Sequence, residues 1–115
     1  LVGSELCIRD RVPDNLPALS DAKAIGLFRI LQEALTNVMR HAQAHTVELT
    51  LTVENADLRL TISDDGVGFV ENPGRPVSFG VVGMRERVLM MGGQLSLHSE
   101  LGEGTTLSVT VPLDA

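Results

Sequence analysis

The spacing of apolar residues predicts one long helix in the first half of the chain. Ser20 or Asp21 can cap its start, because their side-chain oxygens accept hydrogen bonds from free backbone N–H groups at a helix N-terminus. Residues 42–44 are expected to close it. Between these limits the apolar positions recur at steps of three and four residues, the period of an amphipathic helix: Ala24, Leu27, Phe28, Leu31, Leu35, Val38 and Ala42.

Shorter stretches alternate between apolar and polar residues, as strands with one buried face do. We expect strands over residues 5–9, 46–53, 58–63, 94–99 and 105–111. A second helix is predicted over 81–91, where Gly92 and Gly93 end it. The order strand, helix, two strands, loop, helix, two strands predicts an α/β (α+β) two-layer sandwich: a mixed, mostly antiparallel sheet with helices packed on one face.

Composition limits the size of the fold and the kinds of partner. The 115 residues suffice for one core, so residues 1–115 are expected to form a single domain. A net charge of −6 argues against a nucleic-acid partner, because binding phosphates needs clustered Lys and Arg. The lone Cys7 excludes an internal disulfide and suits a reducing cytosol. No apolar run approaches the roughly 20 residues that span a bilayer, so no membrane contact by this segment is expected.

The polar face of the long helix carries the first candidate site. Glu33, Asn37 and His41 follow one another at four-residue steps, with Arg40 beside them. Mg²⁺ prefers oxygen ligands and often uses one or two protein groups plus phosphate oxygens, so the Asn37 amide can be a ligand. Glu33, one turn earlier, can orient or deprotonate an attacking group. The alternative is an ordinary polar, solvent-facing side of a helix.

The end of the strand over 58–63 carries the second candidate site. A carboxylate at Asp64, facing a cavity, can accept a hydrogen bond from an exocyclic amine such as that of adenine. Gly66 and Gly68 allow the backbone to turn sharply and to approach a planar ligand. The alternative is an ordinary Asp-Gly turn.

Glycines also stand where a phosphate could bind. Gly80 and Gly83 flank the start of the second helix, whose free N–H groups and positive dipole end favour an anion. A loop with tolerant glycines is the alternative. The turn over 102–104 leads to Thr105, whose hydroxyl can face a ligand, although most such sequences are plain hairpin turns.

Zinc is a weaker possibility. His41 and His45 are four residues apart, a spacing that binds zinc when both residues lie on one helix. The predicted helix ends between them, so we do not expect a zinc site.

These pieces, in this order, resemble the ATP-binding catalytic domain of two-component sensor histidine kinases, which has the Bergerat ATP-binding fold. The similar segments are EALTNVMRH (residues 33–41, the N box), DDGVGF (64–69, the G1 box) and FGVVGMRER (79–87, the G2 region). The last of these is similar to the nitrate-sensor and sugar-phosphate-sensor branch, whose ATP lids are short. The resemblance covers roughly residues 19–112. Two departures affect the lid: Ser78 replaces the first glycine of the G2 region, and no phenylalanine-rich F box precedes it.

The resemblance implies a role for each candidate residue. Asn37 would bind Mg²⁺, Glu33 would assist catalysis, and Asp64 would contact the adenine amine. The other residues carried over border the nucleotide: Arg40 and His41 near the phosphates, and Gly66, Gly68, Gly80, Gly83 and Thr105 around the pocket.

The resemblance also implies an enzyme that binds Mg·ATP and donates the γ-phosphate to a histidine on a separate dimerisation domain of its parent kinase, which then signals to a response regulator. None of the three histidines fits the acceptor, and the chain begins at Leu1 without a methionine. We therefore expect a cytoplasmic piece of a larger kinase, anchored in the membrane or not, that does not phosphorylate itself in isolation. Two alternatives remain: a serine kinase of the anti-sigma-factor type, and a non-catalytic module that responds to nucleotide.

Overall fold

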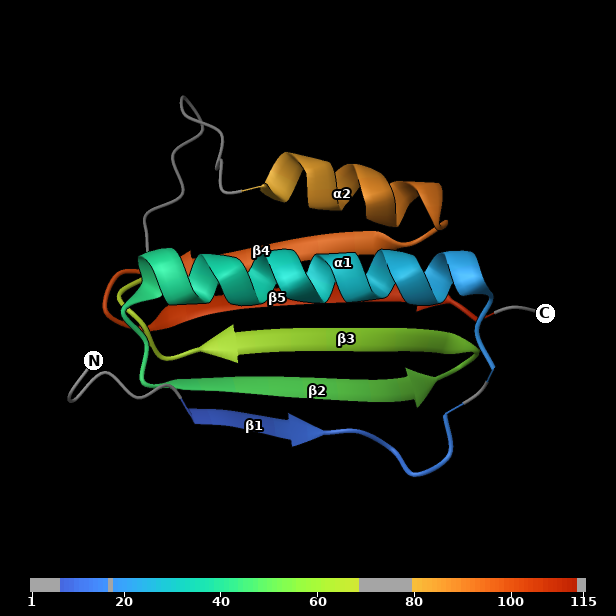
Figure 1. Cartoon of the computed structure of the whole chain (residues 1–115), viewed down its shortest axis with the longest axis horizontal. Coiled ribbons are helices and arrows are strands. Elements are labelled where there is room, and N and C mark those ends of the chain that lie inside the picture. Colours follow the sequence, from blue (N-terminus) through green and yellow to red (C-terminus); the bar gives the residue numbers. More distant parts are fainter. Residues whose placement is uncertain (1–6, 17, 69–79, 114–115) are drawn as a thin grey trace.

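The computed structural model describes residues 7–16, 18–68 and 80–113, apart from the side chains of His41 and Ala42. Within these residues one sheet has the strand order β1-β2-β3-β5-β4. Its strands are β1 (Cys7–Arg11), β2 (Thr46–Glu54), β3 (Asp57–Asp64), β4 (Gln94–Glu100) and β5 (Gly104–Pro112). The helices α1 (Asp21–Asn37) and α2 (Val81–Met90) lie over one face of this sheet (Figure 1).

The sheet is mixed because the connections along the chain differ in length. The crossover through α1 separates β1 from β2, and these strands run parallel, with Cys7 paired to Thr46. The other neighbours, β2–β3, β3–β5 and β4–β5, are antiparallel. Asn55 and Ala56, with φ of 51° and 67°, form the short turn between β2 and β3. The predicted two-layer sandwich, with a mixed, mostly antiparallel sheet and helices on one face, is confirmed.

The first strand ends two residues later than predicted. The alternating pattern predicts residues 5–9, and β1 is Cys7–Arg11, while residues 1–6 lie outside the described part of the chain. The extent of β1 follows from its pairing, since consecutive residues up to Arg11 align with β2 up to Thr50. All side chains of β1 are exposed, so no buried face marks its limits in the sequence.

The core forms where the two helices pack on alternate residues of the sheet. Its buried members on the helices are Leu27, Ile30, Ala34, Val38, Val81, Met84 and Val88, and those on the sheet are Val47, Leu58, Leu60, Ile62, Leu95, Leu107, Val109 and Val111. The buried stripe of α1 differs from the predicted one: Ile30 is 0% exposed, whereas Phe28 is 57% exposed. Full burial of a side chain such as Ile30 contributes about 1.5–3 kcal/mol, so the stripe containing it decides which face of α1 meets the sheet.

The long helix closes at residues 42–43, within the predicted range, but its last turn is not α-helical. α1 ends at Asn37, and Val38–Ala42 form a π-helical turn that Gln43 ends in the left-handed conformation, with φ of 51°. Glu33 and Asn37 therefore share the last regular turn, while Arg40 and His41 belong to the wider turn, in which hydrogen bonds span five residues. The regular four-residue spacing that we predicted as far as His41 thus stops at Asn37.

Segments that are far apart in the sequence meet at one end of the sheet. Figure 1 shows the C-terminal end of α1, the end of β3 and the turn between β4 and β5 on the same side, with the start of α2 facing that side. The fold therefore brings the predicted N box, the G1 box and the turn before Thr105 to the same end of the sheet.

Candidate functional site

Asp64 ends β3 as a buried carboxylate. The residue is 9% exposed, and its Oδ1 accepts a hydrogen bond of 2.8 Å from the backbone N–H of Gly66. The backbone N–H of Thr105, its partner across the β3–β5 pairing, also donates to this carboxylate. Burial raises the pKa of Asp64 above its ordinary value, and the two N–H donors oppose that shift. The carboxylate is thus held in one place inside the fold, which an exposed Asp-Gly turn would not achieve.

Two glycines allow the backbone to close tightly around Asp64. Gly68 has φ of 65°, and a Cβ there would lie 2.0 Å from the carbonyl oxygen of Glu100. Gly104 has φ of 90°, and a Cβ there would lie 2.0 Å from the carbonyl oxygen of Asp64 itself. The N–H of Gly102 donates to the carbonyl of Val67 at 2.8 Å, joining the segment after β3 to the β4–β5 turn. Only glycine fits positions 68 and 104 in this arrangement.

Ser99 supports Thr105 from the neighbouring strand. The Ser99 side chain is buried, its hydroxyl lies 2.8 Å from that of Thr105, and it donates to the carbonyl of Gly104 at 3.1 Å. Sequence reasoning did not select Ser99. The alternation of this strand places Ser99 on the buried side. A buried hydroxyl needs a hydrogen-bond partner, so this position could have indicated its role.

Asp65 performs a structural role next to the buried carboxylate. Its Oδ1 accepts hydrogen bonds from the backbone N–H groups of His45 and Thr46, at 2.8 and 2.9 Å. These donors lower the pKa of Asp65. Asp65 therefore ties the start of β2, just after the helix, to the end of β3, and this link was also missed from the sequence.

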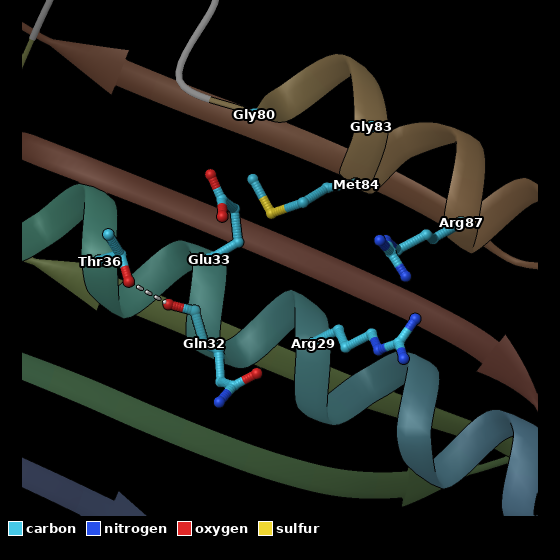
Figure 2. A pocket seen from close by; sticks show the side chains of 8 residues that line it. All are labelled: Arg29, Gln32, Glu33, Thr36, Gly80, Gly83, Met84 and Arg87. Atoms are coloured by element: carbon cyan, nitrogen blue, oxygen red, sulfur yellow. Dashed lines mark hydrogen bonds between the residues drawn. The ribbon is translucent and has the colours of Figure 1, made fainter.

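Glu33 lines a pocket between the two helices. The pocket has a volume of about 550 Å³ and is lined by Arg29, Gln32, Glu33 and Thr36 of α1 and by Gly80, Gly83, Met84 and Arg87 at and after the start of α2 (Figure 2). α1 and α2 run in opposite directions along it (Figure 1). Of the predicted residues, the pocket brings together Glu33, Gly80 and Gly83.

Gly80 touches Glu33 directly. It caps α2 with φ of 77°, and a Cβ there would lie 2.2 Å from the Glu33 Oε1. Gly83 differs, since a Cβ at that position would meet nothing within 4 Å. Of these two glycines, Gly80 is the one that the close approach of backbone to the Glu33 carboxylate requires.

The remaining predicted residues lie at the helix end or outside the described part. Asn37 is half-buried in the last turn of α1, and Arg40 is exposed in the π-helical turn. The His41 side chain and residues 69–79, which hold the predicted lid with Ser78, lie outside the described residues. Apart from Asn37 and Arg40 at the helix end, the described site residues form two groups: Asp64, Gly66, Gly68 and Thr105 at the end of β3, and Glu33, Gly80 and Gly83 between the helices.

This fold with these two groups of residues has the architecture of an ATPase domain of the Bergerat type. The chain belongs to the histidine kinase-, DNA gyrase B-, and HSP90-like ATPase family, whose model matches residues 22–115.

Similar proteins are sensor histidine kinases. The sensor histidine kinase LiaS of Bacillus subtilis is 41% identical over 96 residues, which are 84% of this chain and 27% of LiaS. The histidine-protein kinase/phosphatase UhpB of Salmonella typhimurium is 42% identical over 96 residues, 83% of this chain and 18% of UhpB. The histidine kinase domain of a blue-light activated kinase from Erythrobacter litoralis superposes with a TM-score of 0.74 at 25% identity, covering 96% of this chain and 56% of that one.

These relatives confirm the predicted resemblance, including the branch to which UhpB belongs, and with it the ATP-binding catalytic part of a histidine kinase. The chain spans 27% of the length of LiaS and 18% of UhpB. Among residues 7–16, 18–68 and 80–113, no helix has the length and apolar character that a membrane crossing requires.

Proposed function

We propose that the chain binds Mg·ATP and supplies its γ-phosphate to a histidine on another domain of a sensor histidine kinase. The observation that carries this proposal is Asp64: a buried carboxylate at a strand end, held by backbone N–H groups from Gly66 and Thr105. A fixed acceptor in a site of low exposure suits an exocyclic amine such as that of adenine.

The residues present fit the nucleotide and its metal. Asn37 offers an amide oxygen, a donor that Mg²⁺ prefers, and the Glu33 carboxylate lies one turn earlier on α1. Bound Mg²⁺ would neutralise phosphate charge, and Arg40 in the next turn adds a positive charge beside Asn37. His41 and the glycines Gly66, Gly68, Gly80 and Gly83 are proposed to border the nucleotide, with Thr105 supporting the pocket.

The proposed chemistry is phosphoryl transfer, in which positioning and charge neutralisation dominate. Glu33 would accept a proton from the attacking group or orient it. We propose that the acceptor histidine lies on a dimerisation domain beyond residues 1–115, and that residues 1–115 act as one catalytic domain in the cytoplasm. A response regulator would receive the signal from the whole kinase, whether or not that kinase is membrane-anchored. The isolated chain would then bind ATP without phosphorylating itself.

Calorimetric titration with ATP, in Mg²⁺ and in EDTA, tests this function. The wild-type chain should bind more tightly in Mg²⁺, and Asn37→Ala should lose that increment. Asp64→Asn should weaken binding roughly 10- to 100-fold, since hydrogen bonds to charged groups contribute about 1.5–3 kcal/mol. Asp57→Asn makes the same chemical change at the other end of β3 and serves as the control. Equal affinity with and without Mg²⁺ would refute the kinase function, and unchanged affinity in a folded Asp64→Asn variant would refute the adenine contact.

A further inference from the structure

The pocket between α1 and α2 contains two facing positive charges. Arg29 comes from α1 and Arg87 from α2, and Figure 2 shows their guanidinium groups reaching toward one another across the pocket. Neither arginine forms an ion pair with an acidic side chain among the described residues. Like charges that face each other repel, so this arrangement is stabilised when an anion lies between them.

The concentration of positive charge is unusual for this chain. It has nine Lys and Arg against fifteen Asp and Glu, so its overall field repels anions. Two of the nine basic residues nevertheless line one pocket. An anion that reaches this pocket is therefore attracted by a local feature, and two planar guanidinium groups match the two oxygens of a carboxylate.

The opposite end of the same pocket is negative. Glu33 lies one helical turn beyond Arg29 along α1, about 6 Å by helix geometry. An anion with charge along its whole length and no bound cation, such as a metal-free polyphosphate, would be repelled at Glu33. A protein segment can bind at both ends of the pocket if it places a proton donor next to Glu33 and a carboxylate next to the two arginines.

We propose that this pocket docks the protein segment that presents the acceptor histidine, and that a carboxylate side chain of that segment binds between Arg29 and Arg87. This inference rests on the proposed function, because it takes Glu33 to be the residue that meets the acceptor. Two observations favour this segment. Its carboxylate complements the charge of the arginine pair, and the arginine pair and Glu33 line the same pocket. Arg29 and Arg87 thus position the acceptor and do not touch the nucleotide.

Autophosphorylation of the kinase that carries this chain, measured as initial rates at saturating Mg·ATP, tests the docking site. Arg29→Glu and Arg87→Glu should each lower the rate about tenfold, and the double variant should lower it further. Arg29→Lys with Arg87→Lys keeps the charge without the guanidinium fork and should recover part of the rate. Arg85→Glu changes the charge equally on α2, but Arg85 donates to the carbonyl of Leu95 and does not line the pocket, so it should keep the wild-type rate.

The outcomes separate this inference from the proposed function. Wild-type rates in the folded double variant would overturn the docking site while leaving Mg·ATP binding and transfer in place. A loss of rate explained by weaker ATP binding, measured by titration of each variant, would assign the arginines to the nucleotide and also overturn it. Absence of Mg·ATP binding in the wild type would remove the proposed function and this inference together. A steeper fall of the wild-type rate with salt than that of the double variant would support the charge pairing.

Discussion

The Cα atom of Gly80 packs against the carboxylate of Glu33, so that a Cβ at position 80 would lie 2.2 Å from Oε1 and 2.8 Å from Cδ. One residue is the cap of α2 and the other is the proposed catalytic carboxylate of α1. This contact couples the start of α2 to the position of Glu33 on α1. Movement of either element therefore changes the surroundings of the carboxylate.

Replacing Gly80 by alanine should damage both stability and phosphoryl transfer. The φ of 77° is strained for any residue with a Cβ, and that Cβ would also displace the Glu33 side chain. We expect a loss of about 1–2 kcal/mol in the free energy of unfolding, measured with urea.

Gly83→Ala is the matched control, since it makes the same change inside α2 where a Cβ meets open space. It should stabilise the chain by about 0.5–1 kcal/mol, because glycine is a poor residue within a helix. Equal effects of the two substitutions would contradict the contact between Gly80 and Glu33.

Asp64→Asn should leave the fold at least as stable as the wild type at neutral pH. Burial raises the pKa of Asp64, so the folded chain binds that proton more tightly than the unfolded chain does. Its ionisation therefore lowers the free energy of unfolding as pH rises from the ordinary value of 3.8 through the raised pKa, and this cost is present at pH 7. The asparagine removes the cost while its oxygen can still accept from Gly66. Thermal melts from pH 4 to 7 measure this, and a large fall in Tm at pH 7 would give Asp64 a structural role instead.

Asp65→Ala should act in the opposite direction. Backbone N–H groups of Thr46 and His45 lower the pKa of Asp65, so its stabilising effect is present above the ordinary value of 3.8 and disappears as pH falls through the lowered pKa. The variant should melt below the wild type at pH 7, and the two curves should converge toward pH 2. The exposed loop residue Asp14 provides the control substitution, Asp14→Ala. A constant difference in Tm across this range would show that the carboxylate charge is not responsible.

Local patterns in the sequence were enough for most of the fold, and the misses arose where distant contacts decide. The limits of β1 depend on pairing with β2, and the buried stripe of α1 depends on which side chains the sheet covers, hence Ile30 inside and Phe28 outside. The π-helical turn after Asn37 leaves no mark in the apolar spacing.

The residues of the candidate site also separate into those that a local pattern predicts and those whose roles depend on distant contacts. Asp64 is predicted because a carboxylate followed by glycines at a strand end is a local signal. The structure places it buried at the end of β3, and its contact with adenine stays a prediction. Asp65 and Ser99 were missed because their roles consist of hydrogen bonds to residues on other strands or across a turn, which spacing alone does not reveal. The two arginines of the helix pocket are 58 positions apart in the sequence (87 minus 29). The sequence does not reveal that they are neighbours, because only the packing of α1 against α2 brings them together.

Ser99→Ala should weaken both the fold and the binding of ATP. The buried hydroxyl lies 2.8 Å from that of Thr105 and donates to the carbonyl of Gly104, and the N–H of Thr105 in turn donates to the Asp64 carboxylate. Losing it should cost about 1 kcal/mol in urea unfolding, and a less fixed Thr105 should lower ATP affinity by a smaller factor than Asp64→Asn does. Ser96→Ala, at an exposed position of the same strand, should change stability by less than about 0.5 kcal/mol and leave affinity unaltered. If Ser99→Ala lowers stability without any change in ATP affinity, the serine supports the sheet alone and has no part in positioning the carboxylate.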